Sequence, residues 1–500
     1  MRKASILFVI IISFFVGISF YVLDPIVAWY IDRQISKVDF LNDNFDYEDL
    51  NVDYTNRSMY LSQFKYKLKD SDIWVEASKL TFKGVDFSEI TKNKRLNVDS
   101  LLVENAKVNY NRKHKKAKVV EPPSELNPFP INIGSVEFVN SELCVQLDSL
   151  RESCFKNFNL IANDVFMNDF HEDESFTYSN FKCNAESVNY ADHIMELIGG
   201  EVYLSSKDSV SVKNVQISNA KNAPEFQKFN IKIKDVSAQL SVSPLIKKEE
   251  LRATNIQLDS FIMDIFYDKS ADQPSKSLLP VSAIKALPFQ LSVDQITINK
   301  GKIKYTEKQT KSTAPITVYF EDVEASLNNL SNDSIELQDN KTLSLIASAR
   351  LLNQSDVELK VEFDNKNDPD AHRVYGSFSS FDLTNMNSLF KEMALLEFKS
   401  GKLDKLSFDF NVFKSHTSGK VDFRYSDLKL LTYKKDENNK LKKRSFFRNL
   451  ITNTFAVRTH NPNGNRLING TVSLKNDPNK TVFNYWWSAI YDGFEDTINR

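Results

Sequence analysis

Glycine, proline and cysteine are all scarce in this chain of 500 residues, which contains 12, 14 and 3 of them respectively. So little glycine and proline excludes a collagen-like or low-complexity chain and favours long strands over many tight corners. Three cysteines, with no Cys-x-x-Cys pair among them, argue against a disulfide-built fold and against a thiolate metal site. An excess of one charge sign is also missing, because 64 Lys and Arg balance 66 Asp and Glu. The composition therefore gives no electrostatic argument for a nucleic-acid partner.

Sequence motifs for catalysis are absent too. No zinc-hydrolase HExxH, phosphate-binding P-loop, GxSxG serine-hydrolase or GxGxxG dinucleotide motif occurs. The histidines are scattered over different segments: His114, His171, His193, His372, His416 and His460. Carboxylates are abundant, but solvated strand faces need them for solubility. We therefore expect no catalytic residue, no metal, no cofactor and no enzymatic activity.

One long apolar run, Ala4–Leu23, follows the basic pair at positions 2 and 3. About 20 apolar residues cross a bilayer core about 30 Å thick, and the basic flank predicts a cytoplasmic N-terminus. A cleaved signal peptide, with Gly17 and Ser19 before the cut, is the alternative. We favour an uncleaved anchor because apolar character continues to Ile31. The expected arrangement is a single membrane pass with a large body on the far side.

A short pattern recurs four times, as two arms of alternating apolar residues around a dipeptide. The four segments are LNVDSLLVENAKVNY (96–110), INIGSVEFVNSELCVQL (131–147), ATNIQLDSFIMDIFYD (253–268) and LSVDQITINKGKIKYTEK (291–308). Their central dipeptides are Asn105-Ala106, Asn140-Ser141, Ser260-Phe261 and Lys300-Gly301. Asn and Gly tolerate the positive φ that two-residue hairpin turns require, whereas Ser-Phe is a poor turn. The pattern predicts four antiparallel β-hairpins.

Each predicted hairpin is apolar on one face and polar on the other. The facing pairs are Val103–Val108, Leu101–Tyr110, Phe138–Leu143, Val136–Val145, Leu258–Met263, Ile256–Ile265, Ile298–Ile303 and Ile296–Tyr305. Strand side chains alternate between faces, so each set lies on one side of its hairpin. We name the following residues as candidates for an apolar groove: Leu101, Val103, Val108, Tyr110, Val136, Phe138, Leu143, Ile256, Leu258, Ile296, Ile298, Ile303 and Tyr305.

The same alternation occupies much of the chain, at 51–69, 209–218, 229–243, 356–364 and 405–413. This predicts a mainly β fold with roughly 25 to 30 strands. Helical patterns are short and occur at 382–398, 445–457 and 484–498. Two architectures fit: a sandwich of two sheets with a shared core, or one sheet curved into a trough whose apolar face holds something else. The alternation alone does not separate them.

The chain divides by pattern into five regions. They are an N-terminal membrane anchor (1–31), a first β-repeat unit (32–120), a middle β-sheet region (121–288), a second β-repeat region (289–440) and a C-terminal helical and strand cap (441–500). Proline-bearing connections at 111–129 and 268–288 lie beside the repeats. We interpret them as insertion loops at a sheet edge rather than domain breaks.

Two cysteines and the aromatic residues near the C-terminus each allow two structural interpretations. Cys144 and Cys154 face each other if the strands flanking 147–151 form a hairpin, either as a disulfide outside the cytoplasm or as two buried thiols. The tail aromatics fit either a membrane interface or a helix that plugs the open end of a sheet: Trp486, Trp487, Tyr491 and Phe494.

In their order along the chain, these segments resemble the AsmA-like proteins, a bacterial envelope family related to bridge-like lipid-transfer proteins, and especially a branch common in Bacteroidota-type bacteria. The resemblance rests on the anchor and on the following segments: LNVDSLLVENAKVNY (96–110), VYLSSKDSVSVKNVQIS (202–218), LPFQLSVDQITINKGKIKYTEK (287–308), LTNMNSLF (383–390), SGKLDKLSFDF (400–410), SGKVDFRYSDLKLLTYKK (418–435) and NYWWSAIYDG (484–493). It implies a trough of antiparallel hairpins that projects from the inner membrane into the periplasm. It also implies binding or transfer of phospholipid along the groove, in support of outer-membrane homeostasis, and it carries no catalytic motif.

Two functions follow as hypotheses. The first is a lipid-binding or lipid-transfer protein whose partners are membrane phospholipids. The second is a non-enzymatic scaffold for envelope assembly, whose sheet edges pair with client proteins. In the second case the protein itself fills its apolar face.

Overall fold

The computed structural model describes residues 24–33, 45–67, 72–93, 95–111, 130–146, 151–167, 176–221, 223, 226–241, 250–270, 280–287, 290–308, 315–332, 342–363, 370–435, 441–443, 458–477 and 480–499. The expected membrane span Ala4–Leu23 and the predicted helix at 445–457 lie outside these residues. Among the helices in these ranges, none has the length and apolarity to cross a bilayer. A short helix occupies residues 24–33.

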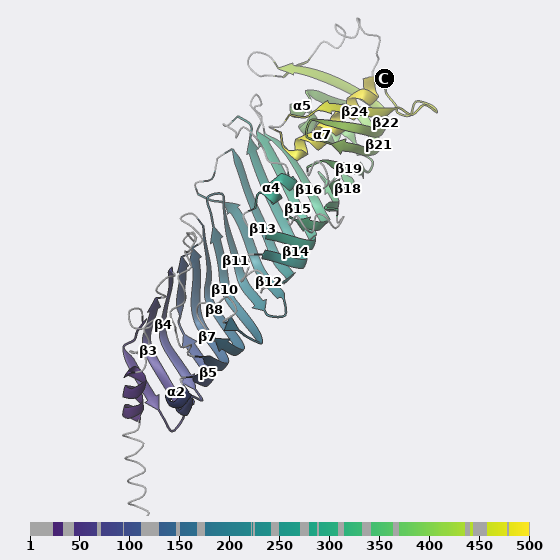
Figure 1. Cartoon of the computed structure of the whole chain (residues 1–500). Coiled ribbons are helices and arrows are strands. Elements are labelled where there is room, and N and C mark those ends of the chain that lie inside the picture. Colours follow the sequence, from purple (N-terminus) through teal and green to yellow (C-terminus); the bar gives the residue numbers. More distant parts are fainter. Residues whose placement is uncertain are drawn as a thin grey trace, which may run out of the picture. The chain divides into compact units, whose positions relative to one another are not determined.

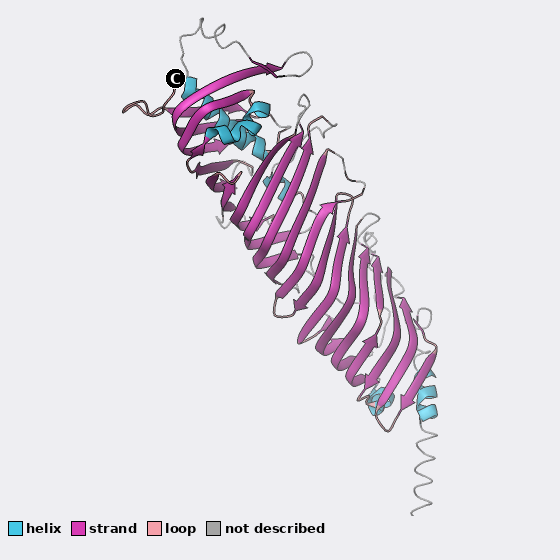
Figure 2. Ribbon diagram, turned by 180° about the vertical axis from the view of Figure 1, so that it is seen from behind, coloured by secondary structure: helices cyan, strands magenta, loops and turns pink. Residues whose placement is uncertain are grey.

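The chain forms two compact units, Met1–Lys213 and Asn214–Arg500 (Figure 1). The division falls inside strand β12 (Ser209–Asn219), at a place that the sequence pattern does not mark. In each unit the strands lie side by side and curve along their length (Figure 2).

The first unit is a mixed sheet that carries helix α2 (Phe87–Asn93) as well as the short helix at residues 24–33. Its strands are β1 (Phe45–Asp46), β2 (Asp49–Asp53), β3 (Ser58–Lys67), β4 (Asp72–Lys83), β5 (Leu96–Glu104), β6 (Lys107–Asn111), β7 (Ile131–Gln146), β8 (Glu152–Met167), β9 (Phe176–Thr177), β10 (Asn180–Ala191) and β11 (Met195–Ser205). Both β1 and β2 pair with β3; β4, the β5–β6 pair, β7, β8, β10 and β11 follow in that order. β9 pairs with the end of β8.

The strands of the second unit also pair in both the antiparallel and the parallel direction. Its strands are β13 (Gln227–Leu240), β14 (Glu250–Asp268), β15 (Gln290–Lys308), β16 (Ile316–Ser331), β17 (Ser344–Leu351), β18 (Ser355–Phe363), β19 (His372–Phe378), β20 (Phe381–Asp382), β21 (Leu396–Val412), β22 (His416–Lys435), β23 (Leu441–Lys443) and β24 (Asn469–Lys475). From β13 to β19 each strand pairs with the next; β19 pairs with β21, β21 with β22 and β22 with β24. Its helices are α4 (Pro280–Lys285), the 3₁₀ turn η2 (Leu383–Met386), α5 (Asn387–Met393) and α7 (Val482–Asn499).

The prediction of a mainly β fold is confirmed, and each of the five alternating segments contributes residues to strands in its described part. The strands are longer than expected, because β14 and β15 have 19 residues each and β22 has 20. The helix predicted at 484–498 is α7. The helix predicted at 382–398 is shorter, since η2 and α5 end at Met393 and β21 begins at Leu396.

The four predicted hairpins are wrong. The second, third and fourth segments are single strands, namely β7, β14 and β15, and each passes straight through its dipeptide. In the first segment β5 and β6 are two parts of one strand line, because both pair with β7 on one side and β4 on the other. The facing pairs expected within each hairpin therefore lie along one strand, on either side of its dipeptide.

Each dipeptide interrupts the alternation within a continuous strand line instead of forming a turn, and a β-bulge with a register shift against the antiparallel neighbour occurs at Asn140-Ser141 and Lys300-Gly301. The first residue of each dipeptide has a positive φ, near 51° at Asn105 and Asn140 and near 54° at Ser260 and Lys300. A two-residue type I′ turn needs positive φ at two positions, whereas a bulge needs one. Both features insert one residue into the alternation, so both keep the apolar arms on one face. This equivalence explains why the sequence pattern was misread.

The four dipeptides lie side by side in parallel pairs. β5 and β6 run parallel to β7, with Glu104 opposite Val139 and Lys107 opposite Glu142. β14 runs parallel to β15, where the register shows no shift across the bulge. Two strands that are interrupted at the same level stay in register and bend together. The antiparallel sheet of the prediction is therefore corrected to a mixed sheet.

The bulge in the first pair exposes backbone groups that a side chain then satisfies. Ser141 is fully buried, and its hydroxyl accepts the backbone N–H of Ala106 at 3.1 Å and donates to the carbonyl oxygen of Val139 at 3.1 Å. An unpaired buried N–H would cost on the order of 1–3 kcal/mol. Ser141 thus ties one repeat to its neighbour at the bend.

A parallel pair needs a long crossover connection, since the chain must return to the same end of the sheet. The proline-bearing connections at 111–129 and 268–288 are these crossovers. Helix α4 belongs to the second crossover, where Asp370 accepts the backbone N–H groups of Val281 and Ser282, each at 3.1 Å.

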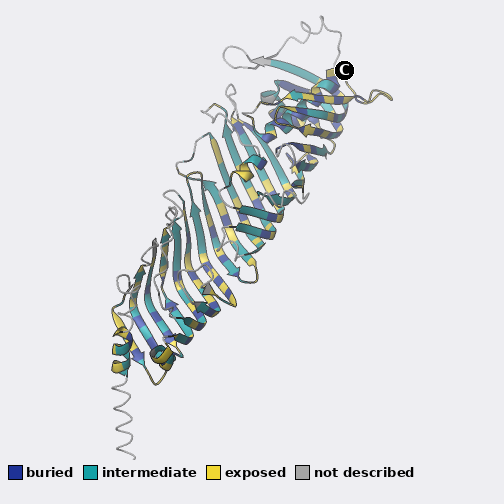
Figure 3. Ribbon diagram, in the orientation of Figure 1, coloured by how far each residue is buried: buried dark blue, intermediate teal, exposed yellow. Residues whose placement is uncertain are grey.

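The apolar face of the first unit has no second sheet on it in the described ranges, because every strand there is bonded into one sheet. Buried and exposed residues alternate along these strands (Figure 3). A local cluster of Phe158, Cys183, Ala185 and Val202 draws all its members from that one sheet. A curved sheet fits this unit better than a two-sheet sandwich.

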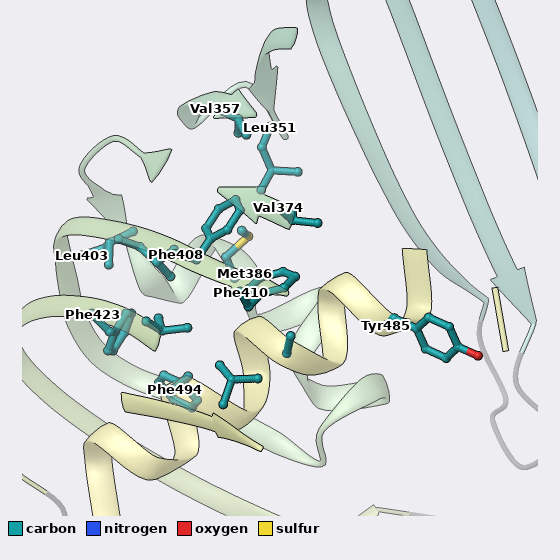
Figure 4. Close-up of a cluster of buried hydrophobic side chains, with 14 of the residues drawn as sticks. Leu351, Val357, Val374, Met386, Leu403, Phe408, Phe410, Phe423, Tyr485 and Phe494 are labelled. Carbon is teal, nitrogen blue, oxygen red and sulfur yellow. The ribbon is translucent and has the colours of Figure 1, made fainter. Parts of the chain in front are cut away.

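The largest core lies in the second unit, where the strands from β17 to β24 enclose α5 and α7. Phe494 of α7 points toward Phe423 of β22 (Figure 4), with ring centroids 5.0 Å apart. Val361, Val374 and Phe410 are completely buried.

The bulge interpretation can be tested at Asn140. Replacement by valine should lower the free energy of unfolding by about 1–2 kcal/mol, because a β-branched residue resists the left-handed backbone. Glycine should be tolerated, since it adopts positive φ without strain.

The matched control is Glu137, an exposed residue at a regular position of the same strand. There valine should be tolerated and glycine should destabilise. Chemical denaturation of all four variants checks both orders, and the same order at the two positions would contradict a bulge at Asn140.

Candidate functional site

The parallel pairing brings the candidate groove residues together across strands. In the first unit Leu101 lies opposite Val136, Val103 opposite Phe138 and Val108 opposite Leu143, and Tyr110 lies opposite Val145. In the second unit Ile256 lies opposite Ile296, Leu258 opposite Ile298, Met263 opposite Ile303 and Ile265 opposite Tyr305. The candidates thus form two apolar surfaces, one in each unit.

Most of these side chains are only half-buried. Val103 and Val136 are buried, at 3% and 8% exposure, while the other candidates keep intermediate exposure. Phe138 and Leu143, which flank the bulge of β7, pack against the same buried cluster around Phe158. The two arms of a repeat therefore share one face, and that face stays partly open.

The second unit contains an apolar cavity of about 260 Å³. Strands β14 to β19, strand β21 and helices α5 and α7 supply its walls. Representative lining residues are Ile303, Val318, Leu359, Phe408, Trp486 and Ile490. Of the groove candidates, Ile303 and Tyr305 line the cavity, and the others lie elsewhere on the two sheets.

The volume of this cavity matters energetically. A closed and empty void of this size would cost on the order of 6 kcal/mol, but this cavity is partly open, so its apolar wall meets water unless a ligand covers it. A domain is typically stable by only about 5–15 kcal/mol. Apolar cavities of about 150 Å³ stay dry and bind small apolar molecules. The cavity is therefore suited to an apolar ligand.

Among the described residues of the cavity wall, Glu307 is the one with a carboxylate, and it is 4% exposed. Its Oε1 lies 2.6 Å from the ammonium of Lys269, and its Oε2 accepts the hydroxyl of Tyr305 at 2.7 Å. Burial, assisted by the negative charge of Glu307, raises the pKa of Tyr305, which keeps its hydroxyl a donor. These partners satisfy the buried charge, as a buried carboxylate requires.

A second ion pair joins the C-terminal ends of β14 and β15, next to the pair of Lys269 and Glu307. The Lys308 ammonium donates to Asp268 at 2.8 Å. Together with hydrogen bonds from Ser270, this contact lowers the pKa of Asp268 to about 2. The two adjacent pairs cross between the parallel strands and hold their ends in register.

The lowered pKa of Asp268 gives a pH prediction. An unfolded aspartate titrates near pH 3.9, so this pair contributes stability above that pH and loses it as the pH falls toward 2. We expect the melting temperature to fall less between about pH 5 and pH 2 in Asp268→Asn than in the parent.

Asp264→Asn is the matched control, because it removes an exposed carboxylate from the same strand. It should melt with the parent's pH dependence. Equal acid sensitivity of Asp268→Asn and the parent would show that the Asp268–Lys308 pair adds no pH-dependent stability.

Helix α7 forms one wall of the cavity and also covers the free edge of β24. The carboxylates of Asp496 and Asp492, one turn apart, accept the backbone N–H groups of Thr471 at 2.7 Å and Ser473 at 2.8 Å. A Cβ at Gly470 would lie 1.8 Å from the carbonyl oxygen of Gly493, so only glycine allows this approach. Unpaired edge groups otherwise invite another strand.

A buried histidine fixes the other half of α7. The indole N–H of Trp486 donates to Nε2 of His372 at 2.8 Å, so Nδ1 of His372 carries the hydrogen that donates to the carbonyl oxygen of Asp370 at 2.7 Å. His372 is 3% exposed. These two hydrogen bonds connect α7 to β19 and to Asp370, whose side chain accepts the backbone N–H groups at the start of α4.

The tail aromatics all belong to α7. Phe494 is buried in the core, Trp487 contacts Phe390 of α5 with ring centroids 5.7 Å apart, and Tyr491 lies 6.0 Å from Phe494. Trp486 and Trp487 line the cavity. In the described part of the chain these side chains therefore pack against the sheet and its helices.

Sequence reasoning did not find the cavity residues of β16, β18 and α5. Ile316, Val318 and Phe320 of β16 alternate as clearly as the repeats do, but nothing in a linear pattern places them opposite α7. Leu389 of α5 has no distinguishing neighbours in the sequence. Only the three-dimensional arrangement joins these residues to Ile303.

The structure joins Cys144 and Cys154 in a disulfide between neighbouring strands β7 and β8, where they are directly opposite. Glu152 lies close to both sulfur atoms, but disulfide sulfurs are not thiolate ligands. Cys183 is a buried thiol, and its burial raises its pKa to about 11.

The disulfide predicts a defined thiol count. Denatured protein prepared with thiols blocked before lysis should react at one thiol without reductant and at three after reduction. Mass spectrometry of alkylated peptides should assign the unprotected thiol to Cys183. Three reactive thiols before reduction would exclude the disulfide.

No protein-family model matches this sequence, and comparison with curated proteins returns no match.

Proposed function

We propose that this chain is a non-enzymatic protein that binds phospholipid through the acyl chains and transfers it along the apolar faces of its sheets. The observation that carries the proposal is the apolar cavity of about 260 Å³, whose wall includes Ile303 and Tyr305 of the repeats. A bound chain would cover the apolar wall of this partly open cavity and remove it from water.

The half-buried apolar faces support the same function. Burying apolar surface stabilises a complex by about 25 cal/mol per Å², so acyl chains gain by lying on strands that leave Leu101, Val108 and Phe138 partly open. The ion pairs at the ends of β14 and β15 keep the charged groups of that region partnered. Phospholipid is the occupant that the AsmA-like resemblance implies.

The proposed location is the inner membrane of a bacterium, with the body in the periplasm. It rests on the apolar run Ala4–Leu23 and its basic flank. Supply of phospholipid from that membrane would contribute to outer-membrane homeostasis. The disulfide between Cys144 and Cys154 suits an oxidising compartment.

The scaffold hypothesis requires an open sheet edge, and the described edge of β24 is covered. Asp492 and Asp496 occupy its backbone N–H groups at Ser473 and Thr471. A client strand could pair there only after α7 leaves. This contact favours the lipid hypothesis over strand addition at β24.

The proposed function can be tested by photo-crosslinking of the full chain in bacterial cells grown with radioactive phosphate. A benzophenone amino acid at Ile303 or Val108 should label the protein with phospholipid, because both side chains lie on the apolar faces. At the exposed neighbours Lys304 and Lys107 labelling should be at background level. Equal labelling at neighbouring positions, or none at Ile303 and Val108, would contradict lipid binding on these faces.

A substitution adds a second test. Ile303→Asp places a charge on the cavity wall and should remove most phospholipid that co-purifies with the full chain, as measured by native mass spectrometry. Lys304→Asp adds the same carboxylate on the opposite face and should leave the lipid content unchanged. If both variants keep the parent's lipid content, the cavity wall does not contact lipid.

A further inference from the structure

The apolar cavity is followed by a separate and much smaller void. A smaller void of about 50 Å³ shares Trp487 and Ile490 with it, and its lining includes Phe398 and Leu403, which are each 1% exposed. A void of about 50 Å³ is too small for an acyl chain, and the buried side chains around it would have to rearrange to admit one. The cavity is therefore closed on the side of β21 and α5.

Helix α7 is held in place at both ends. Toward its C-terminus, Asp492 and Asp496 bond the edge of β24, and Gly493 lies against Gly470. Toward its N-terminus, Trp486 donates to buried His372. A helix with contacts of this kind at both ends is a fixed wall rather than a swinging lid.

We propose that this cavity is a blind pocket for the methyl end of one acyl chain, and that α7 is the wall that stops the chain. This inference rests on the proposed function and names the part of the ligand that the cavity receives. The chain would reach the cavity along Ile303 and Tyr305, which belong both to the repeats and to the cavity wall.

The volume and chemistry of the cavity favour a single chain end over a whole phospholipid. Its volume of about 260 Å³ exceeds the roughly 150 Å³ that accepts a benzene ring. It is smaller than the roughly 300–1,000 Å³ of pockets that enclose a complete drug-sized ligand. The carboxylate on its wall, Glu307, is already paired with Lys269 and Tyr305. In the part of its wall that the structure describes, no cluster of cationic groups is present to receive a phosphate.

The test uses the full chain in bacterial cells supplied with one of two photoactivatable fatty acids. One carries a diazirine at the terminal carbon, and the other carries it beside the carboxyl group. The terminal probe should label the α7 peptide that contains Ile490 about ten-fold more than the carboxyl-side probe. Strand β6, at Val108, should be labelled by both probes, because the open face has no end wall.

A cavity-filling variant provides the second measurement. Val318→Phe adds a ring on the cavity wall and should lower labelling of α7 by the terminal probe about ten-fold, with β6 unaffected. Ile346→Phe is the control, because Ile346 is 50% exposed and does not line the cavity. It should change neither signal.

The outcomes separate the two proposals. Equal labelling of α7 by both probes, no labelling of α7 while β6 is labelled, or no effect of Val318→Phe would overturn the blind pocket and leave lipid binding in place. Labelling of no strand and no helix by either probe would overturn the proposed function as well.

Discussion

Coincident left-handed residues in neighbouring parallel strands are the constraint on which the repeat-built parts of both units depend. A left-handed residue shifts the alternation of its strand by one position, and an unmatched shift would put the next strand out of register. Here the left-handed residues Asn105 and Asn140 lie at one level, and so do Ser260 and Lys300. The strands therefore bend together while their apolar arms keep a common face. The one-sided surface follows from this match.

The two units use that surface differently. In the first unit the apolar face is covered only in patches, such as the cluster around Phe158. In the second unit helices α5 and α7 pack against the strands, and residues such as Val361 and Phe410 in that core are completely buried. The cavity lies within the second unit, between the apolar face of β14 to β16 and the helices α5 and α7. Helix α7 forms part of the cavity wall and also accepts the backbone N–H groups at the edge of β24.

The features that the sequence predicted correctly are those that depend on residues close together along the chain. Alternation identified the strands and the shared face of Val103 and Val108, and the amphipathic tail identified α7, since both depend on residues close in sequence. The hairpins were wrong because a turn and a bulge change the alternation identically, and the choice between them depends on a partner strand some 35 residues away. The cavity was not predictable for the same reason. Val318, Leu389 and Ile490 meet only after several strands and two helices have assembled.

The parallel steps also decide at which rim of the sheet the chain emerges. In an antiparallel meander every strand reverses direction, so connections alternate strictly between the two rims. A crossover such as the one between β14 and β15 returns the chain to the rim it started from and reverses that order for every later connection. The rim on which a given long or short loop lies can therefore change while the strands stay the same. A single parallel pair therefore changes the rim on which each later loop lies. In this way one parallel pair can bring loops to the same side of the molecule.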